Sequence, residues 1–258
     1  MPSIFINFIK KLIPNRYGWY GDYRSWNDAE NESAGYDSNE ILDKVRNSLM
    51  SVKEGNGVFE RDGILFDEIQ YSWPLISGLM YSAAKSDGVI NVLDFGGSLG
   101  STYFQNKIFL DQFNNVSWNI VEQKHFVDVG KKEFENERLK FYYSTDMAME
   151  KEKANILLML SVLQYIDEPY QLLEKLLENN FDHIIIDRTP FSKIKETIKI
   201  QKVPPEIYNA SYPCWFFDES KLIKFFDDRE YNVIESFYNE EPETEEYLFK
   251  GFIISKKC

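Results

Sequence analysis

Val92-Leu93-Asp94-Phe95-Gly96-Gly97-Ser98-Leu99-Gly100 is the stretch of sequence that decides the fold. An apolar run ends in an acid, and a glycine-rich turn and helix-compatible residues follow. This order is typical of the first strand, turn and crossover helix of a doubly wound α/β domain, where a nucleotide-like cofactor binds at the carboxyl end of the strand. We therefore expect a Rossmann-like sheet whose cofactor pocket includes Gly96, Gly97 and Gly100.

Two acidic residues indicate which cofactor this pocket binds. In a dinucleotide-binding fold the strand leads into glycine, so that backbone N–H groups approach an anionic pyrophosphate, which Asp94 would repel. A carboxylate there suits a cofactor with a cationic amino-acid end, such as S-adenosylmethionine (SAM). Glu122 ends the next apolar run, Trp118-Asn119-Ile120-Val121, where a carboxylate can accept both hydrogen bonds of a ribose diol. The two acids and the glycines together predict a SAM site.

Length, charge and cysteine usage restrict the class of protein. The chain has 258 residues, which corresponds to one large α/β domain or to one domain with an appended cap. Its net charge of −13 argues against nucleic acid as a partner, because phosphates require a basic surface. Cys214 and Cys258 form neither a disulfide framework nor a metal-ligand spacing, so we expect a cytoplasmic protein without a metal.

Residues 1–13 have the pattern of a short amphipathic helix. The apolar positions that share one helical face are Ile4, Phe5, Phe8, Ile9 and Leu12. The segment is too short to span a bilayer. We expect it to dock on the domain or on a partner subunit in a homodimer; the alternative is a helix lying on the inner face of the membrane.

The remaining pattern predicts the order of the elements. Expected strands cover residues 118–122, 140–143, 155–160 and 183–186 besides the one before Asp94, with helices at 124–137 and 169–179 between them. This alternation predicts a parallel sheet, and a helix at 218–226 followed by strands at 231–237 and 247–255 is the ending of a class I methyltransferase fold. We assign residues 87–258 to the cofactor-binding core and 203–217 to an insertion on the acceptor side. Residues 1–86, which include helices at 39–53 and 71–85 and a hairpin around Asp62-Gly63, are assigned to an N-terminal cap.

Several further motifs resemble those of one bacterial family. They are Gly21-Asp22-Tyr23-Arg24-Ser25-Trp26-Asn27-Asp28-Ala29, Gly35-Tyr36-Asp37, Val121-Glu122-Gln123, Leu163-Gln164-Tyr165-Ile166, Ile186-Asp187-Arg188-Thr189-Pro190-Phe191 and Tyr212-Pro213-Cys214-Trp215-Phe216. Together with the glycine turn they are similar to the methyltransferases found among capsule and O-antigen biosynthesis genes, along almost the whole chain. The resemblance implies SAM as cofactor and a glycan or glycan precursor as acceptor.

The same resemblance implies roles for individual residues. The glycine turn with Asp94 would surround the methionine end of the cofactor, and Glu122 would hold the ribose. Asp146 follows a strand at the place where such folds contact the adenine amine; Ser144 is the alternative, and either residue could instead cap a helix. Ser161 follows the fourth strand and would lie beneath the sulfonium.

Candidates for catalysis follow from the chemistry of the acceptor. Methyl transfer depends on alignment, and a base is needed only if the acceptor is a hydroxyl. Gln164 occupies a position where many small-molecule methyltransferases carry His. A glutamine side chain cannot take a proton, so we expect Gln164 to contact the acceptor and not to act as a base. Asp187 could deprotonate a hydroxyl or orient Arg188, which could hold an anionic acceptor; a structural ion pair is the alternative. His125 is the other candidate base, unless it stacks beside the adenine or caps the next helix.

Aromatic side chains are expected to form the acceptor wall. The candidates are Tyr20, Tyr23, Tyr208, Tyr212 and Trp215. Such side chains stack on sugar rings or nucleobases, and packing in the core is their other use.

Three functions are compatible with this sequence. The first, which we predict, is O-methylation of a surface-polysaccharide precursor at a hydroxyl, phosphate or phosphoramidate oxygen. The second is a dinucleotide-dependent sugar dehydrogenase or epimerase, which Asp94 and the C-terminal hairpin disfavour. The third is a non-catalytic SAM-binding partner in a glycan assembly complex, which only a turnover assay distinguishes from the first.

Overall fold

The computed structural model describes residues 17–35, 38–239 and 243–257, so the amphipathic segment 1–13 lies outside the described residues. Five strands run parallel: β4 (Val89–Phe95), β5 (Asn115–Val121), β6 (Leu139–Tyr142), β7 (Ile156–Leu160) and β8 (His183–Ser192). β12 (Tyr247–Lys256) pairs antiparallel with β8, and β11 (Tyr231–Tyr238) pairs antiparallel with β12. The strand order is β11-β12-β8-β7-β4-β5-β6, which confirms the predicted doubly wound sheet with its C-terminal antiparallel strands.

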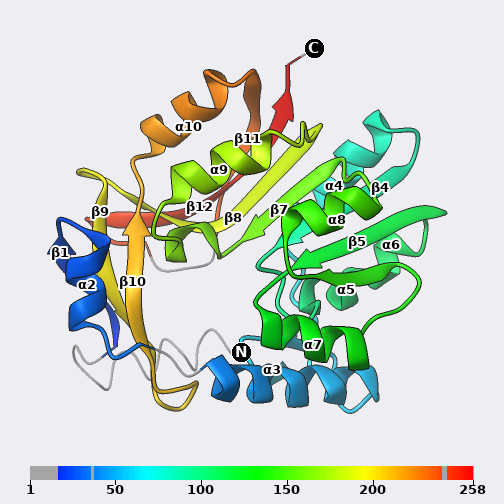
Figure 1. Ribbon diagram of the computed structural model, residues 1–258, viewed down its shortest axis with the longest axis horizontal. Helices are drawn as coiled ribbons and strands as arrows, with labels where there is room; N and C mark the ends of the chain where they lie inside the picture. The colour runs from blue at the N-terminus through cyan, green and yellow to red at the C-terminus, as the bar shows by residue number, and fades with distance from the viewer. Residues whose placement is uncertain (1–16, 36–37, 240–242, 258) are drawn as a thin grey trace.

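Helices cover both faces of this sheet (Figure 1). One face carries α3 (Ser38–Lys53), α4 (Trp73–Lys85), α5 (Ser101–Gln105), α6 (Lys107–Leu110) and α7 (Lys124–Glu133). The other carries α8 (Thr145–Lys151), α9 (Pro169–Leu177) and α10 (Glu219–Asp227). Neighbouring strand residues therefore enter opposite cores, as Val92 and Leu93 do. This double burial explains why the strands read as continuous apolar runs.

Helix α4 belongs to the core although it falls within the range 1–86 that the sequence pattern assigns to the cap. Ser72 caps its first turn by accepting the N–H of Leu75, and Pro74 occupies the first turn, where its missing N–H costs nothing. Leu75 and Leu79 pack with Ile185 of β8 in the core on the sheet face that α3 to α7 cover. The cap therefore ends before this helix.

A second, three-stranded sheet lies to the left of the main sheet in Figure 1. It consists of β1 (Gly18–Tyr23), β9 (Thr197–Lys202) and β10 (Ser211–Phe216), all antiparallel, in the order β1-β9-β10. Helix α2 (Trp26–Glu32) packs on it through Ala29, which contacts the buried Ile198 and Ile200. The sequence pattern predicts none of these three strands. The pairing of β1 with β9 joins segments about 180 residues apart in the chain, which local periodicity does not report.

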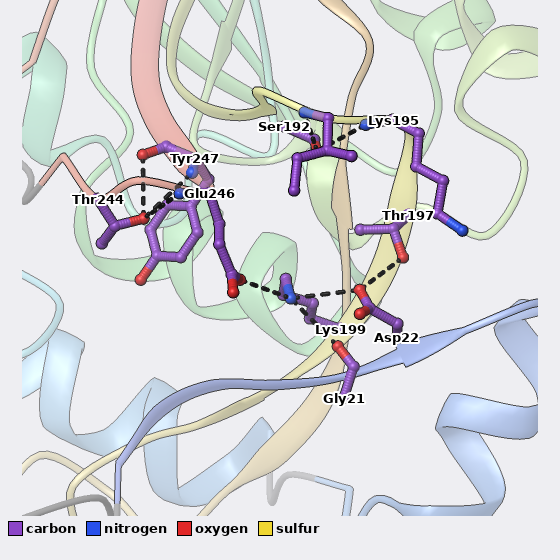
Figure 2. Close-up of polar contacts among 10 residues, drawn as sticks. Gly21, Asp22, Ser192, Lys195, Thr197, Lys199, Thr244, Glu246 and Tyr247 are labelled. Atoms are coloured by element: carbon purple, nitrogen blue, oxygen red, sulfur yellow. Dashed lines mark hydrogen bonds and ion pairs between the residues drawn. The ribbon is translucent and has the colours of Figure 1, made fainter.

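Lys199 ties this sheet to the main one, as Figure 2 shows. Its side chain is 11% exposed, and its Nζ lies 3.3 Å from Asp22 Oδ1 on β1 and 3.4 Å from Glu246 Oε2 just before β12. Nζ also donates to the carbonyl oxygen of Gly21 at 3.3 Å, and the Thr197 hydroxyl donates to Asp22 Oδ1 at 3.1 Å. One buried cation thus joins three segments that are distant in sequence.

A two-stranded hairpin, β2 (Phe59–Arg61) and β3 (Ile64–Phe66), completes the cap. Asp62 and Gly63 form its turn with φ values of 54° and 77°, as the Asp-Gly pair predicts. Within the described part of the chain, no helix has the length and apolar character needed to cross a membrane.

Candidate active site

A cavity of about 400 Å³ lies at the carboxyl ends of the central strands. The strand order reverses between β4 and β7, which is where ligands bind in open α/β sheets. The lining residues supplied by the main sheet and its loops include Asp94, Gly96, Gly97, Ser98, Glu122, Ser161 and Arg188. The cap covers the opposite side with Trp19, Val45, Glu60 and Arg61, and the segment 203–217 adds Tyr208 and Tyr212. The structure thus brings two acids, the glycine turn and Ser161 to one cavity.

Asp94 is a buried carboxyl group without an ion-pair partner among the described residues. It is 1% exposed, and its Oδ2 accepts a hydrogen bond from Trp118 Nε1 at 2.9 Å. Burial, with a smaller contribution from Glu122, raises its pKa to about 7, while Trp118 and Arg188 act in the opposite direction. A ligand cation placed beside Asp94 would favour its ionised form. The chemistry of this position therefore fits an ammonium group, as SAM carries.

Gly97 lies directly against this carboxyl group. A Cβ atom built on Gly97 would lie 2.5 Å from the carboxyl carbon of Asp94 and 2.5 Å from its Oδ2. Only glycine permits this approach without moving the acid.

Glu122 is held by the loop it faces. Its Oε1 accepts the N–H of Ser98 at 3.3 Å, and its Oε2 accepts the N–H of Gln123 at 2.7 Å. Burial raises its pKa, and these two backbone donors counteract that effect. Each carboxylate oxygen has a second lone pair, so Glu122 retains the capacity to accept two hydroxyl donors of a ribose.

Backbone strain is concentrated at this cavity. Four of its lining residues are non-glycine residues with left-handed backbone: Asp62, Ser98, Ser161 and Arg188, with φ between 51° and 57°. Such conformations cost about 1–3 kcal/mol each and persist where the surrounding structure requires them, most often at functional sites.

A β-bulge directs Arg188 into the cavity. The sequence pattern ends this strand at Ile186, but β8 continues to Ser192, and its register with β12 shifts at Asp187 and Arg188. Opposite them stands Gly251, where a Cβ atom would come within 2.7 Å of the Ile186 carbonyl oxygen. Bulges of this kind re-aim a side chain beside an active site.

Asp187 stabilises this bulge. Its Oδ1 accepts the backbone N–H of Arg188 at 2.8 Å and the side-chain amide of Asn239 at 2.5 Å, and its Oδ2 accepts the Ser72 hydroxyl at 3.2 Å. It does not line the first cavity. These contacts support the positioning role for Asp187, which lines the second cavity described below.

A second cavity of about 250 Å³ opens beside the first. The two share Arg61, Thr102, Gln105, Leu160 and Arg188 as lining residues. The second is otherwise lined by residues that include Tyr71, Trp73, Asp187, Tyr238 and Asn239. Two adjoining cavities with a common wall suit a cofactor and an acceptor that must meet.

His125 and Asp146 do not line either cavity. The His125 ring packs against Phe126 with ring centroids 4.9 Å apart, and its buried Nε2 has no hydrogen-bond partner among the described residues. Asp146 is exposed and lies 3.6 Å from Lys175, while Ser144 caps α8 by accepting the N–H of Met147. The helix-cap alternative thus accounts for Ser144.

Three of the predicted aromatic residues also lie away from the cavities. The Tyr23 hydroxyl donates to Glu32 at 2.7 Å, Tyr20 packs near Lys202, and Trp215 stacks on Trp26. These three contribute to the packing of the small sheet. Tyr208 and Tyr212 line the first cavity.

Gln164 and Gly100 do not line either cavity but support residues that do. Gln164 is 1% exposed and donates to Ser161 Oγ at 3.1 Å and to the Arg188 carbonyl oxygen at 3.2 Å, so it connects two strained lining residues. Gly100 adopts φ 95° before α5 and faces Leu139, not the cavity.

Glu60 and Trp118 contribute to the site, although the sequence pattern predicts neither. Glu60 is 2% exposed; its carboxylate accepts the Gly63 N–H at 2.8 Å and the Ser101 hydroxyl, and burial raises its pKa to about 7. The Asp62-Gly63 turn predicts the hairpin, but no local signal places it over the glycine turn. In the described residues no cluster of His, Cys, Asp and Glu could hold a metal ion.

Comparisons with known proteins address the fold. No family model matches the chain, and no curated protein matches its sequence. The N-terminal domain of EvdMO1 with S-adenosylhomocysteine (SAH) bound matches with a TM-score of 0.52 and 14% identity, over 87% of this chain and 98% of that chain. The same values hold for that domain in the presence of SAH and D-fucose. The 1,6-didemethyltoxoflavin-N1-methyltransferase of Burkholderia thailandensis matches with a TM-score of 0.46 and 11% identity, over 95% of this chain and 97% of that chain. The chain has the α/β fold of the class I SAM-dependent methyltransferases.

Proposed function

We propose that this chain is a SAM-dependent methyltransferase that methylates an oxygen atom of a capsular or O-antigen polysaccharide precursor. The observation that carries the proposal is the buried Asp94 carboxyl group, packed against Gly97 in the cavity that Glu122 also lines. The EvdMO1 domain, which has the same fold, binds SAH. A pyrophosphate of a dinucleotide would meet two acids here, which disfavours the dehydrogenase and epimerase alternative.

Different residues of the site would hold different parts of the cofactor. When bound, SAM supplies an electrophilic methyl group attached to a sulfonium. Asp94 would hold the ammonium group and Glu122 the ribose, so that the reactive end lies toward Ser161 and the wall shared with the second cavity. Alignment of acceptor and methyl group accounts for much of the acceleration in such displacements, up to about 7–11 kcal/mol.

The sugar acceptor is supported by less direct observations. The sequence motifs resemble those of polysaccharide methyltransferases, and Trp73 and Tyr238 at the second cavity offer aromatic surfaces on which a sugar ring can stack. The acceptor oxygen is a sugar hydroxyl or belongs to a phosphate or phosphoramidate substituent.

Calorimetric titration with SAH tests the cofactor. We expect the purified protein to bind SAH, and Asp94→Asn and Glu122→Ala each to weaken binding at least tenfold. Asp146→Ala is the matched control, because this exposed acid lies outside both cavities and its loss should leave binding unchanged. Transfer of labelled methyl from SAM to nucleotide-linked and lipid-linked sugars then tests the activity. Absence of SAH binding in the unmodified protein would refute the proposal, and binding without turnover on any glycan precursor would favour the non-catalytic alternative.

A further inference from the structure

The two adjoining cavities differ in charge. The acidic side chains that line the first cavity are Glu60, Asp62, Asp94 and Glu122. Both cavities share two cationic side chains, Arg61 and Arg188, and among the described residues the second cavity has one acidic lining residue, Asp187. The first cavity therefore attracts a cation and the second an anion, with both guanidinium groups at their common wall.

Asp187 does not form an ion pair with either arginine among the described residues. Its two oxygens accept hydrogen bonds from Ser72, Asn239 and the backbone N–H of Arg188. The carboxylate is thus directed at neutral donors that stabilise the bulge. Asp187 therefore does not neutralise the guanidinium group of Arg188 at this wall.

Arg188 presents a buried N–H donor, unpaired among the described residues, at the wall shared by the two cavities. The strained backbone at φ 51° and the glycine opposite it direct the side chain to the wall shared by the two cavities. Its Nε is buried and makes no hydrogen bond to any described residue. A buried donor left unpaired costs free energy, which an oxyanion in the cavity would recover.

Arg61 is oriented toward the same wall from the cap hairpin. Its Nη2 lies 3.3 Å from Gln70 Oε1, and its guanidinium lies 5.4 Å from the centre of the Phe59 ring. These contacts orient the planar group, so the ordering cost on binding is reduced.

Exposed aromatic residues line the same cavity. Trp73 is 61% exposed and Tyr238 is 68% exposed, although residues this large are usually covered. Tyr71 packs beside Trp73 with ring centroids 5.4 Å apart. Aromatic faces beside two arginines form a surface for a ring that carries a negative charge.

We propose that the second cavity is the acceptor site and that the acceptor is a sugar with an anionic substituent held between Arg61 and Arg188. The substituent is a carboxylate or a phosphate ester, which share the oxyanion that a guanidinium group recognises. This inference rests on the proposed function, because it takes the first cavity as the cofactor site.

The test measures binding of three probes to the protein saturated with SAH. The probes are glucuronate, glucose 1-phosphate and the neutral methyl glucoside. We expect at least one anionic probe to bind at least tenfold more tightly than methyl glucoside, and whichever binds more tightly identifies the substituent as carboxylate or phosphate. We expect Arg188→Met and Arg61→Met each to abolish this preference. Arg24→Met is the matched control, because Arg24 is exposed and lines neither cavity.

Titration with SAH alone separates this inference from the proposed function. If Arg188 holds the acceptor, Arg188→Met keeps its SAH affinity within threefold while losing the anionic probe, and Arg188→Lys recovers part of the loss. If Arg188→Met loses SAH affinity tenfold or more, the residue serves the cofactor carboxylate and the inference is overturned while the cofactor assignment stands. Equal binding of charged and neutral probes also overturns it. Circular dichroism spectra confirm that each variant is folded.

Discussion

Replacement of Gly97 by alanine should disable the cofactor site without removing any of its polar groups. The added methyl group would lie 2.5 Å from the Asp94 carboxyl carbon, which is well inside contact distance. Asp94 has a short side chain, is 1% exposed and is held by Trp118 at 2.9 Å, so it cannot rotate away freely. Either the acid or the glycine turn must shift.

The size of the effect follows from the interaction that is lost. A hydrogen bond to a charged group contributes about 1.5–3 kcal/mol, which corresponds to about 10- to 150-fold in affinity. We therefore expect Gly97→Ala to weaken SAH binding, measured by calorimetry, within this range. Gly97 does not have left-handed backbone, so backbone strain at this residue contributes little to the loss.

Gly55→Ala serves as the control for this substitution. Gly55 is exposed, its φ is 81°, and a Cβ atom there would meet no atom within 4 Å. Alanine in this conformation costs about 1–2 kcal/mol of stability but should leave SAH affinity unchanged. If Gly97→Ala is folded and binds SAH within twofold of the unmodified protein, the cofactor does not bind against Asp94.

Three further predictions concern pH and stability. SAH affinity should fall as pH decreases from 8 to 6, since the pKa of Asp94 is raised to about 7 and only its ionised form holds a cation; affinity that is flat over this range in calorimetry would contradict this. Burial raises the pKa of Glu60 from 4.5 to about 7, so the folded state binds the proton of this carboxyl group more tightly than the unfolded state does, and stability is lost as pH rises through this window. In thermal melts at pH 8, Glu60→Gln should therefore be more stable than the unmodified protein by up to about 3 kcal/mol. A stability advantage of Glu60→Gln that is no larger at pH 8 than at pH 5 would refute this. Lys199→Met should lower the free energy of unfolding by about 1–2 kcal/mol, a small value because both carboxylate partners are largely exposed. Lys195→Met is the control, since Lys195 is exposed and its loss should leave stability unchanged. Equal denaturation midpoints of Lys199→Met and the unmodified protein would show that the buried cation does not stabilise the cap.

The elements of the core could be predicted because their signals are local. The apolar run before Asp94 marks β4, Asp62-Gly63 marks a hairpin, and Pro74 marks the first turn of α4. Each depends on residues within a few positions of one another, since side-chain periodicity and turn chemistry act over that range.

The wall of the site could be predicted only in part. The acids at the ends of β4 and β5 reach the first cavity because carboxyl ends of parallel strands meet at one edge of a sheet. Asp146 also follows a strand, yet it turns to solvent and Lys175, because its position in the first turn of α8 directs it outward. A position after a strand does not determine where the side chain points.

The sequence alone therefore determined the fold class, the order of the core elements and the two acids beside the glycine turn. Only the tertiary structure decided that β1 pairs with β9, that the Glu60 hairpin covers the glycine turn, and that a bulge opposite Gly251 places Arg188 between two cavities. The physical reason is the range of the interactions. Propensity and periodicity act between neighbours in the chain, whereas strand pairing, burial and cavity shape arise between segments that meet only after the chain has folded.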